Sequence, residues 1–253
     1  MKPIRTLGGL ACRVQQLNER RETYVNCIDA IATSSHRIAD LLIPDNYDRR
    51  VPSCPEWSLL DLAIHLGQVQ EFWSHSIREA NADAPWSGDR TYPRSNEDAS
   101  TWMRNQTKKL VEAISTSSEE SPCWTWWEDP RTAKAVSLHQ VQEAEVHRWD
   151  AELAIGQPAP LPLEIASDGL TEFLHVHRFS IEELKLPHIQ IEASDVEGAW
   201  YINASAKHAV TVRATASDLV LFLYGRLSTE ALIIEGNPEA IERLALAIPQ
   251  INS

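Results

Sequence analysis

Several features that would assign the chain to a familiar class are missing from its sequence. No stretch approaches the roughly 20 consecutive apolar residues that a membrane-spanning helix needs, and residues 1–21 contain no apolar core of the kind found in secretory signals. The sequence also has no internal repeat and no low-complexity tract. These absences predict a cytoplasmic protein with no membrane partner, in which residues 1–21 form an N-terminal extension.

Basic residues and cysteines are also scarce. Lys and Arg number 23 against 36 Asp and Glu, for a formal net charge of −13, so the chain lacks the positive charge that binds nucleic-acid phosphates. The four cysteines lie far apart and form no CxxC pair. This spacing argues against a zinc ribbon or a disulfide framework and suits a reducing compartment. We therefore expect buried or incidental thiols and no nucleic-acid partner.

The remaining composition is that of an ordinary globular protein. Apolar residues make up 43% of the 253 residues and charged residues 23%, which excludes a disordered chain and leaves length for two modest domains. Apolar side chains recur at three- and four-residue steps through the first two-thirds, the periodicity of helices. Four helices are typical of a four-helix bundle. The pattern predicts helices at about residues 22–43, 58–80, 97–117 and 130–155, with a proline-bracketed loop at 51–57.

The sequence changes character after residues 157–162, which contain three prolines. Alternating and β-branched segments follow one further helix, as expected for strands. The predicted order is a helix at 163–184, strands at 188–193, 199–203 and 209–214, a helix at 219–227, a strand at 231–234 and a helix at 238–248. We therefore expect an α+β fold in two domains, a helical bundle over 22–158 and a small C-terminal α+β domain over 159–253.

Three residues of the fourth predicted helix share one face. His139, Glu143 and His147 stand four residues apart, and at 3.6 residues per turn their side chains lie on one stripe. An imidazole and a carboxylate one turn apart suit a borderline divalent metal ion, and helical bundles commonly build metal sites in this way. The best candidate for a facing ligand is His65, an imidazole among apolar residues of the second helix, where it needs a polar partner. The spacing alone does not separate this site from a solvated Glu–His pair and a core histidine.

Three segments of the sequence carry further motifs. They are VPSCPEWSLLDLAIHLGQVQEFW at 51–73, EAEVHRWDAELAIGQPAPLPLEIASDGLTEFL at 143–174, and DLVLFLYGRL with IIEGNPEAIERL between 218 and 244. Together they resemble the mycothiol-dependent maleylpyruvate isomerase family of actinobacteria, and the resemblance covers most of residues 22–248. It implies a DinB-like helical bundle followed by a small C-terminal domain.

The resemblance also implies a ligand set. Matched to the family's motifs, His65 of the first segment and Glu143 and His147 of the second are the expected ligands of a divalent metal ion, and zinc is the expected element. Three protein ligands leave an open coordination position, as in catalytic rather than structural zinc sites, and water or a thiol would fill it. The implied thiol cosubstrate is mycothiol.

The sequence departs from the family pattern in places. Gln142 stands where the family often has His before the ligating Glu, and Tyr224 stands where it usually has Trp before Gly-Arg. The Gln142 position is not a ligand, so the metal-site prediction is unaffected. The tryptophan cluster at 124–127 and the extension at 1–21 are not family features, and they indicate a specialised substrate.

The predicted chemistry begins with a thiol bound at the metal. A metal-stabilised thiolate is a strong nucleophile, so the resemblance predicts an S-transferase or a cis–trans isomerase. One alternative is a metal-dependent hydrolase or lyase in which no thiol takes part. Another is a non-catalytic binding or regulatory protein. As partners we expect a small-molecule electrophile and a low-molecular-weight thiol, with the chain as a monomer or homodimer.

Two charged residues near the metal motif are candidates for catalytic roles. Arg226, in the C-terminal motif, would hold a carboxylate of the substrate, although an ordinary surface arginine has the same appearance. Asp150 follows His147 by three residues and so lies near the metal-binding face, where it would orient a ligand or serve a structural role. Arg90 and Arg94 are weaker candidates for anion binding. Five other histidines have no partner at a regular spacing and are interpreted as incidental: His75, His175, His177, His188 and His208.

Overall fold

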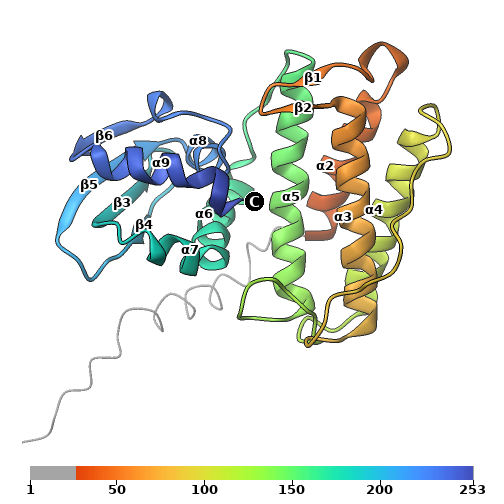
Figure 1. Ribbon diagram of the computed structural model, residues 1–253, viewed down its shortest axis with the longest axis horizontal. Helices are drawn as coiled ribbons and strands as arrows, with labels where there is room; N and C mark the ends of the chain where they lie inside the picture. Colours follow the sequence, from red (N-terminus) through yellow and green to blue (C-terminus); the bar gives the residue numbers. More distant parts are fainter. Residues whose placement is uncertain (1–26, 253) are drawn as a thin grey trace, which may run out of the picture.

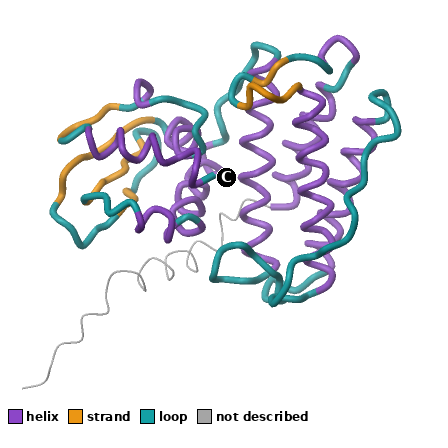
Figure 2. The backbone as a smooth tube through the Cα atoms, in the orientation of Figure 1, coloured by secondary structure: helices purple, strands orange, loops and turns teal. Residues whose placement is uncertain are grey.

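Four long helices pack side by side in one half of the molecule (Figures 1 and 2). They are α2 (Cys27–Leu41), α3 (Leu59–Glu79), α4 (Ala99–Thr116) and α5 (Ala133–Ala154). The computed structural model describes residues 27–252, so the predicted extension at 1–21 lies outside the described residues. Across residues 27–252, none of the helices has the combined length and apolarity that crossing a bilayer requires.

The sequence specifies where the two helices with the candidate ligands begin. Ser58 caps α3, because its hydroxyl accepts from the Asp61 backbone N–H at 3.2 Å and the Asp61 carboxylate accepts from the Ser58 N–H at 2.9 Å. This reciprocal pair satisfies two backbone donors that a helix start otherwise leaves open. Thr132 caps α5 by accepting from the backbone N–H of Ala135. Both helix starts are therefore fixed locally, before any packing between helices.

The segment before α3 differs from the prediction. The loop expected at 51–57 is instead a small antiparallel ribbon of β1 (Arg50–Val51) and β2 (Cys54–Ser58). Its two prolines are tolerated because an isolated two-stranded ribbon has no central ladder for them to interrupt. The ribbon follows the short 3-10 helix η1 (Pro44–Asn46). It matters for the site because it holds Trp57 against the candidate ligands.

The second half of the chain is a four-stranded mixed sheet with helices (Figure 2). The strand order is β4-β3-β5-β6, with β3 and β5 parallel and the outer strands antiparallel to them. Apolar residues of β3 and β5 pack with α6, α8 and α9 in one core. The elements are α6 (Leu163–Val176), α7 (Arg178–Glu183), β3 (His188–Ala193), β4 (Ala199–Ile202), β5 (His208–Ala214), α8 (Ala216–Leu223), η2 (Thr229–Ala231), β6 (Ile233–Gly236) and α9 (Glu239–Ile251).

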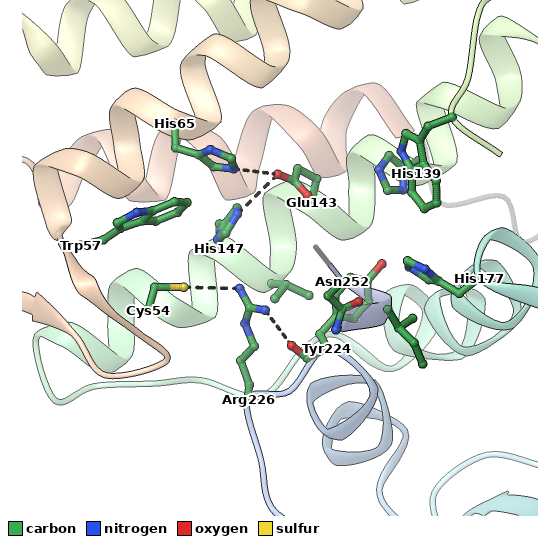
Figure 3. A pocket seen from close by; sticks show the side chains of 13 residues that line it. Cys54, Trp57, His65, His139, Glu143, His147, His177, Tyr224, Arg226 and Asn252 are labelled. Carbon is green, nitrogen blue, oxygen red and sulfur yellow. Dashed lines mark hydrogen bonds and ion pairs between the residues drawn. The ribbon is translucent and has the colours of Figure 1, made fainter. Parts of the chain in front are cut away.

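The α+β fold class is confirmed, with one local correction. The single helix predicted over 163–184 is two helices, α6 and α7, because the backbone leaves helical geometry at His177 (φ −94°, ψ 12°). The apolar periodicity continues through this point, so the pattern gave no sign of the break. The break turns the His177 side chain into the space between the two halves of the molecule (Figure 3).

The two halves meet along α5. Val146 and Trp149 on this helix belong to the same apolar core as the sheet and its helices. The end of α9 also reaches the boundary, so that the chain finishes between the bundle and the sheet (Figure 1). A pocket lies at this boundary, lined from the bundle by α3 and α5 and from the second half by residues of α9 and the segment after α8.

Candidate metal centre

Three side chains from two helices converge on one point (Figure 3). His65 extends from α3, and Glu143 and His147 extend from α5 one turn apart. Their potential ligand atoms all lie within 4.8 Å of one another. Nε2 of His65 and Nε2 of His147 each lie 3.4 Å from Oε1 of Glu143. The structure thus brings together the three residues that the sequence predicted as metal ligands.

The donor set and its spacing fit a divalent metal ion. Two ligands of tetrahedral zinc, each about 2.0 to 2.1 Å from the metal, stand roughly 3.3 Å apart. The two separations of 3.4 Å to the Glu143 oxygen have this length. Imidazole nitrogen and carboxylate oxygen are donors that zinc and neighbouring transition metals accept. The three residues could therefore hold such an ion with little movement.

The three side chains lie at one end of a cavity of about 450 Å³. The indole of Trp57 covers one side of them, with its ring centre 4.6 Å from that of His65 and 6.3 Å from that of His147. A cavity of this size admits a small organic molecule. A ligand in the pocket would therefore have direct access to the point where the three side chains meet.

A buried carboxylate orients the ring of His147. Nδ1 of His147 lies 2.9 Å from Oδ2 of Asp150, whose side chain is fully buried. Burial by itself lowers the pKa of His147, but hydrogen bonds to Asp150 and Glu143 outweigh it and raise this pKa to about 9. The same contacts hold the pKa values of both carboxylates below their ordinary range in spite of burial. A carboxylate on the second ring nitrogen commonly fixes the tautomer and orientation of a metal-binding histidine.

Arg226 reaches the same carboxylate from the second half of the chain. It follows a left-handed turn at Gly225 (φ +77°), a conformation that glycine adopts without steric cost. Its Nη2 donates to Oδ2 of Asp150 at 2.8 Å, and its Nη1 donates to the backbone carbonyl of Tyr224 at 2.7 Å. The hydroxyl of Ser53 also donates to Asp150. Because Asp150 balances the charge of Arg226, the predicted role of this arginine in holding a substrate carboxylate stays a prediction.

The other residues considered from the sequence lie elsewhere. His139 stands four residues before Glu143 on α5, but it is not one of the residues whose donor atoms converge. It is partly buried at the pocket wall, where its Nδ1 lies 2.8 Å from Oε1 of Glu172 in α6. Arg90 and Arg94 do not line this pocket. The candidate site therefore draws on α3, α5 and the segment after α8, and not on the loop before α4.

Several pocket residues were missed from the sequence. Cys54, His177 and Asn252 line the cavity, although the histidine and the cysteine were interpreted as incidental. Burial raises the pKa of the Cys54 thiol, and the nearby guanidinium of Arg226 opposes this shift. Each of these side chains comes from a different segment, so no spacing rule connects them. The kink at His177 and the ribbon before α3, which place two of them, are properties of the folded chain.

Comparisons with known proteins point to one family. The family model described as the mycothiol maleylpyruvate isomerase N-terminal domain matches residues 28–152. This range contains all three converging side chains. No curated protein sequence matches the chain.

Two solved structures have a similar fold. A crystal structure of the mycothiol-dependent maleylpyruvate isomerase is 13% identical, with a TM-score of 0.61 over 83% of this chain and 92% of that chain. A crystal structure of a mutant of that enzyme, in which a histidine is replaced by alanine, is 14% identical, with a TM-score of 0.61 over 87% of this chain and 94% of that chain. The predicted resemblance is confirmed, and at this identity the structural likeness establishes the fold alone.

Proposed function

Because residues 28–152 belong to the mycothiol maleylpyruvate isomerase N-terminal domain family, we propose that the protein is a metal-dependent enzyme that joins a low-molecular-weight thiol to a small electrophile. The thiol is mycothiol, and the reaction is an S-transfer or a cis–trans isomerisation. The observation that carries this proposal is the convergence of His65, Glu143 and His147 within 4.8 Å at the end of a cavity that admits a small molecule.

The metal's contribution follows from the ligands available. A divalent ion, zinc as the first expectation, supplies the Lewis acidity that keeps a thiol ionised near neutral pH. The chain's own contribution is to place the donors. His147 is oriented by Asp150, which Arg226 and Ser53 hold in turn. Restricting the motion of the donors in this way lowers the reorganisation needed when the metal binds.

Both candidate reactions start with the same bond. In an S-transfer by addition, the thiol sulfur forms a bond to the electrophilic carbon and the thiol proton also ends on the substrate. In an isomerisation the same carbon–sulfur bond forms, the substrate rotates about its former double bond, and sulfur and proton leave again. Trp57 and Arg226 flank the metal end of the pocket. We propose that Trp57 limits water access there and that Arg226 faces the electrophile's polar group.

Metal analysis of the purified protein tests this proposal. We expect about one divalent ion per chain in the wild type and loss of the ion in His147→Ala. The matched control is His139→Ala. This variant removes a histidine that also stands four residues from Glu143 on the same helix, and it should leave the metal content unchanged. A wild-type protein that binds no stoichiometric divalent ion, even after incubation with zinc, would contradict the proposal.

Thiol use needs a separate measurement. Calorimetric titration of the zinc-loaded protein with mycothiol and with glutathione should show binding of the former. Binding should disappear in His147→Ala and persist in His75→Ala, which removes a histidine outside the pocket. If neither thiol binds to protein that does contain metal, a hydrolase or lyase that uses no thiol becomes the better explanation.

A further inference from the structure

The pocket has a second polar end, built from residues outside the metal-binding group. His139 and Glu172 form an ion pair there, and the hydroxyl of Tyr224 donates to the other oxygen of Glu172 at 3.2 Å. His177 and Asn252 complete this end (Figure 3). We call these five residues the distal cluster. They come from α5, α6, the segment after α8, the break before α7 and the end of α9.

His177 presents an unpaired acceptor to the pocket. His177 is only 5% exposed, and its Nδ1 is buried without a hydrogen-bond partner among the described residues 27–252. Burial is the main reason that its pKa falls to about 4, so the ring is neutral at pH 7. The backbone of Ile251 accepts a hydrogen bond from this ring. We assign the ring proton to Nε2, because Nδ1 has no hydrogen-bond partner among residues 27–252, and Nδ1 of the neutral ring then keeps a lone pair.

Asn252 presents a second acceptor. Its amide nitrogen donates to the backbone carbonyl of Leu223 at 3.2 Å, which fixes the orientation of the side chain. Its Oδ1 is buried and has no hydrogen-bond partner in residues 27–252. A buried oxygen or nitrogen left unpaired costs free energy, and most buried polar groups in proteins are satisfied. Two such acceptors at one end of a pocket indicate that a ligand supplies the donor.

The remaining members of the cluster do not favour an anion. Glu172 neutralises the charge of His139, and it also accepts a hydrogen bond from the hydroxyl of Tyr224. Burial, and then the charge of Glu172, raise the pKa of Tyr224, so that its hydroxyl stays protonated and committed to this bond. A carboxylate placed here would therefore meet two lone pairs and an ion pair without net charge. The cluster suits a neutral donor.

An aromatic wall completes this end of the pocket. The indole of Trp126 is 48% exposed although its neighbour Trp127 is buried. Its ring centre lies 5.2 Å from that of His177 and 5.9 Å from that of His139. An exposed indole beside buried polar groups offers a flat surface for a planar or ring-shaped ligand.

We propose that the distal cluster binds a hydroxyl group of the ligand, which donates its one proton to Nδ1 of His177 or to Oδ1 of Asn252, and that it selects against a carboxylate at that position. This inference deepens the proposed function, since the hydroxyl belongs either to the electrophile or to the thiol. The two ends of the pocket then have separate tasks. One activates the thiol, and the other selects the molecule by its neutral polar group.

Phenol and anisole test the hydroxyl site without relying on a metal. They share the ring and its oxygen, and anisole has a methyl group in place of the proton that phenol donates. Calorimetric or ligand-observed NMR titrations of the full-length protein, both zinc-loaded and metal-stripped, should show phenol binding about 10-fold more tightly than anisole, as expected for one hydrogen bond. In the variant that removes the acceptor, His177→Phe or Asn252→Leu, this ratio should fall to about 3-fold or less.

Three controls keep the result specific. His75→Phe makes the same substitution at a histidine outside the pocket, where it stacks on Trp86, and should leave the phenol-to-anisole ratio unchanged. Benzoate binding should change less than 2-fold in His177→Phe, because a carboxylate is expected to avoid the distal cluster. Equal binding of phenol and anisole to the wild type would overturn the proposal, as would a ratio that persists in both pocket variants.

Two thiols show which reactant carries the hydroxyl. Cobalt-loaded protein is titrated with 6-mercaptohexan-1-ol and with hexane-1-thiol, and the cobalt–thiolate absorption band reports binding. A preference for the hydroxyl thiol that is lost in His177→Phe or in Asn252→Leu assigns the hydroxyl to the thiol. Equal binding of the two thiols, together with the phenol preference, assigns it to the electrophile. Absence of the band with both thiols contradicts the proposed function, and the phenol and anisole titrations still decide the hydroxyl site.

Discussion

The two ends of the pocket differ in how completely their polar atoms are paired. At the metal end, Asp150 binds one ring nitrogen of His147, and Glu143 lies beside the other. At the distal end, His177 and Asn252 each keep a buried polar atom without a partner in the part of the chain that the structure describes. The metal end is thus assembled by the protein itself, whereas the distal end leaves two polar atoms open. In the functions that we propose, rigidity serves metal binding and the unpaired groups serve selectivity.

Two histidines on α5 sharpen this comparison. His147 and His139 stand four residues after and four residues before Glu143, and each has its Nδ1 within 2.9 Å of a buried or half-buried carboxylate oxygen. They differ in what faces them across the pocket. His65 of α3 faces only the former. Identical spacing on one helix therefore gives two different environments, and the facing helix decides which histidine can bind a metal.

The largest effect is expected from Glu143→Gln. The carboxylate is the donor that both His65 and His147 approach at 3.4 Å, and a neutral amide is a poor ligand for zinc. We expect zinc affinity, measured by competition with a chromophoric chelator, to fall by more than about 100-fold, beyond the range typical of a lost orienting group. Glu172→Gln is the matched control, because it removes the carboxylate that holds His139, and its zinc affinity should stay within about 3-fold of the wild type. Similar losses in both variants would erase the proposed difference between the two ends.

A smaller effect is expected from Asp150→Asn. The variant keeps a polar partner for His147 but loses the charge that pairs with Arg226. Removing such an orienting partner typically costs about 10- to 100-fold in metal affinity. The buried guanidinium also loses its counter-ion, so the free energy of unfolding should fall too. Zinc affinity must therefore be measured under conditions where circular dichroism shows that the variant is folded. An unchanged affinity under these conditions would mean that His147 binds the metal without the orienting charge of Asp150.

The lowered pKa of the buried His177 ring should make the stability of the protein depend on pH. Its pKa is lowered from 6.5 to about 4 in the folded protein, so between these values the unfolded chain binds a proton that the folded chain does not. Stability therefore falls as the pH drops from about 6.5 towards 4. At 1.36 kcal/mol per pKa unit, this one group should account for about 2 kcal/mol of loss between pH 7 and pH 4.5.

Urea unfolding at these two pH values measures the effect. The wild type should lose about 2 kcal/mol more than His177→Phe, in which the titrating ring is gone. Carboxylates elsewhere titrate in both proteins and cancel in the difference. Parallel losses in the two proteins would show that the ring is already protonated, or already hydrated, in the folded state.

The sequence was sufficient for the fold class and for the metal end of the pocket. Helix periodicity and the prolines at 157–162 are local signals, and the four bundle helices that the periodicity predicts are present with small shifts of their described ends. Glu143 and His147 share one helix, so spacing alone placed them together. His65 needed one additional assumption, that its apolar helix faces α5, and the packing of α3 against α5 satisfies it.

The distal cluster could not be predicted in the same way. Its five residues come from separate elements, and no pair of them has a helical spacing that would attract notice. His177 enters the pocket only because the helix expected over 163–184 breaks at that residue. Asn252 enters only because α9 ends against the bundle. Contacts of this kind depend on the packing of the two halves, which local sequence signals do not encode.

The smallest effect is expected from Trp126→Ala, and it separates the aromatic wall from the hydroxyl site. Because nearly half of this indole is exposed, its removal should change the free energy of unfolding by less than about 1 kcal/mol, whereas Trp127→Ala, at a buried neighbour, should cost about 3 to 5 kcal/mol. Phenol and anisole both have a ring to stack, so Trp126→Ala should weaken both by a similar factor of about 3. Their ratio should stay at the wild-type value. A ratio that collapses with the indole would place the selectivity in the shape of the wall rather than in the two unpaired acceptors.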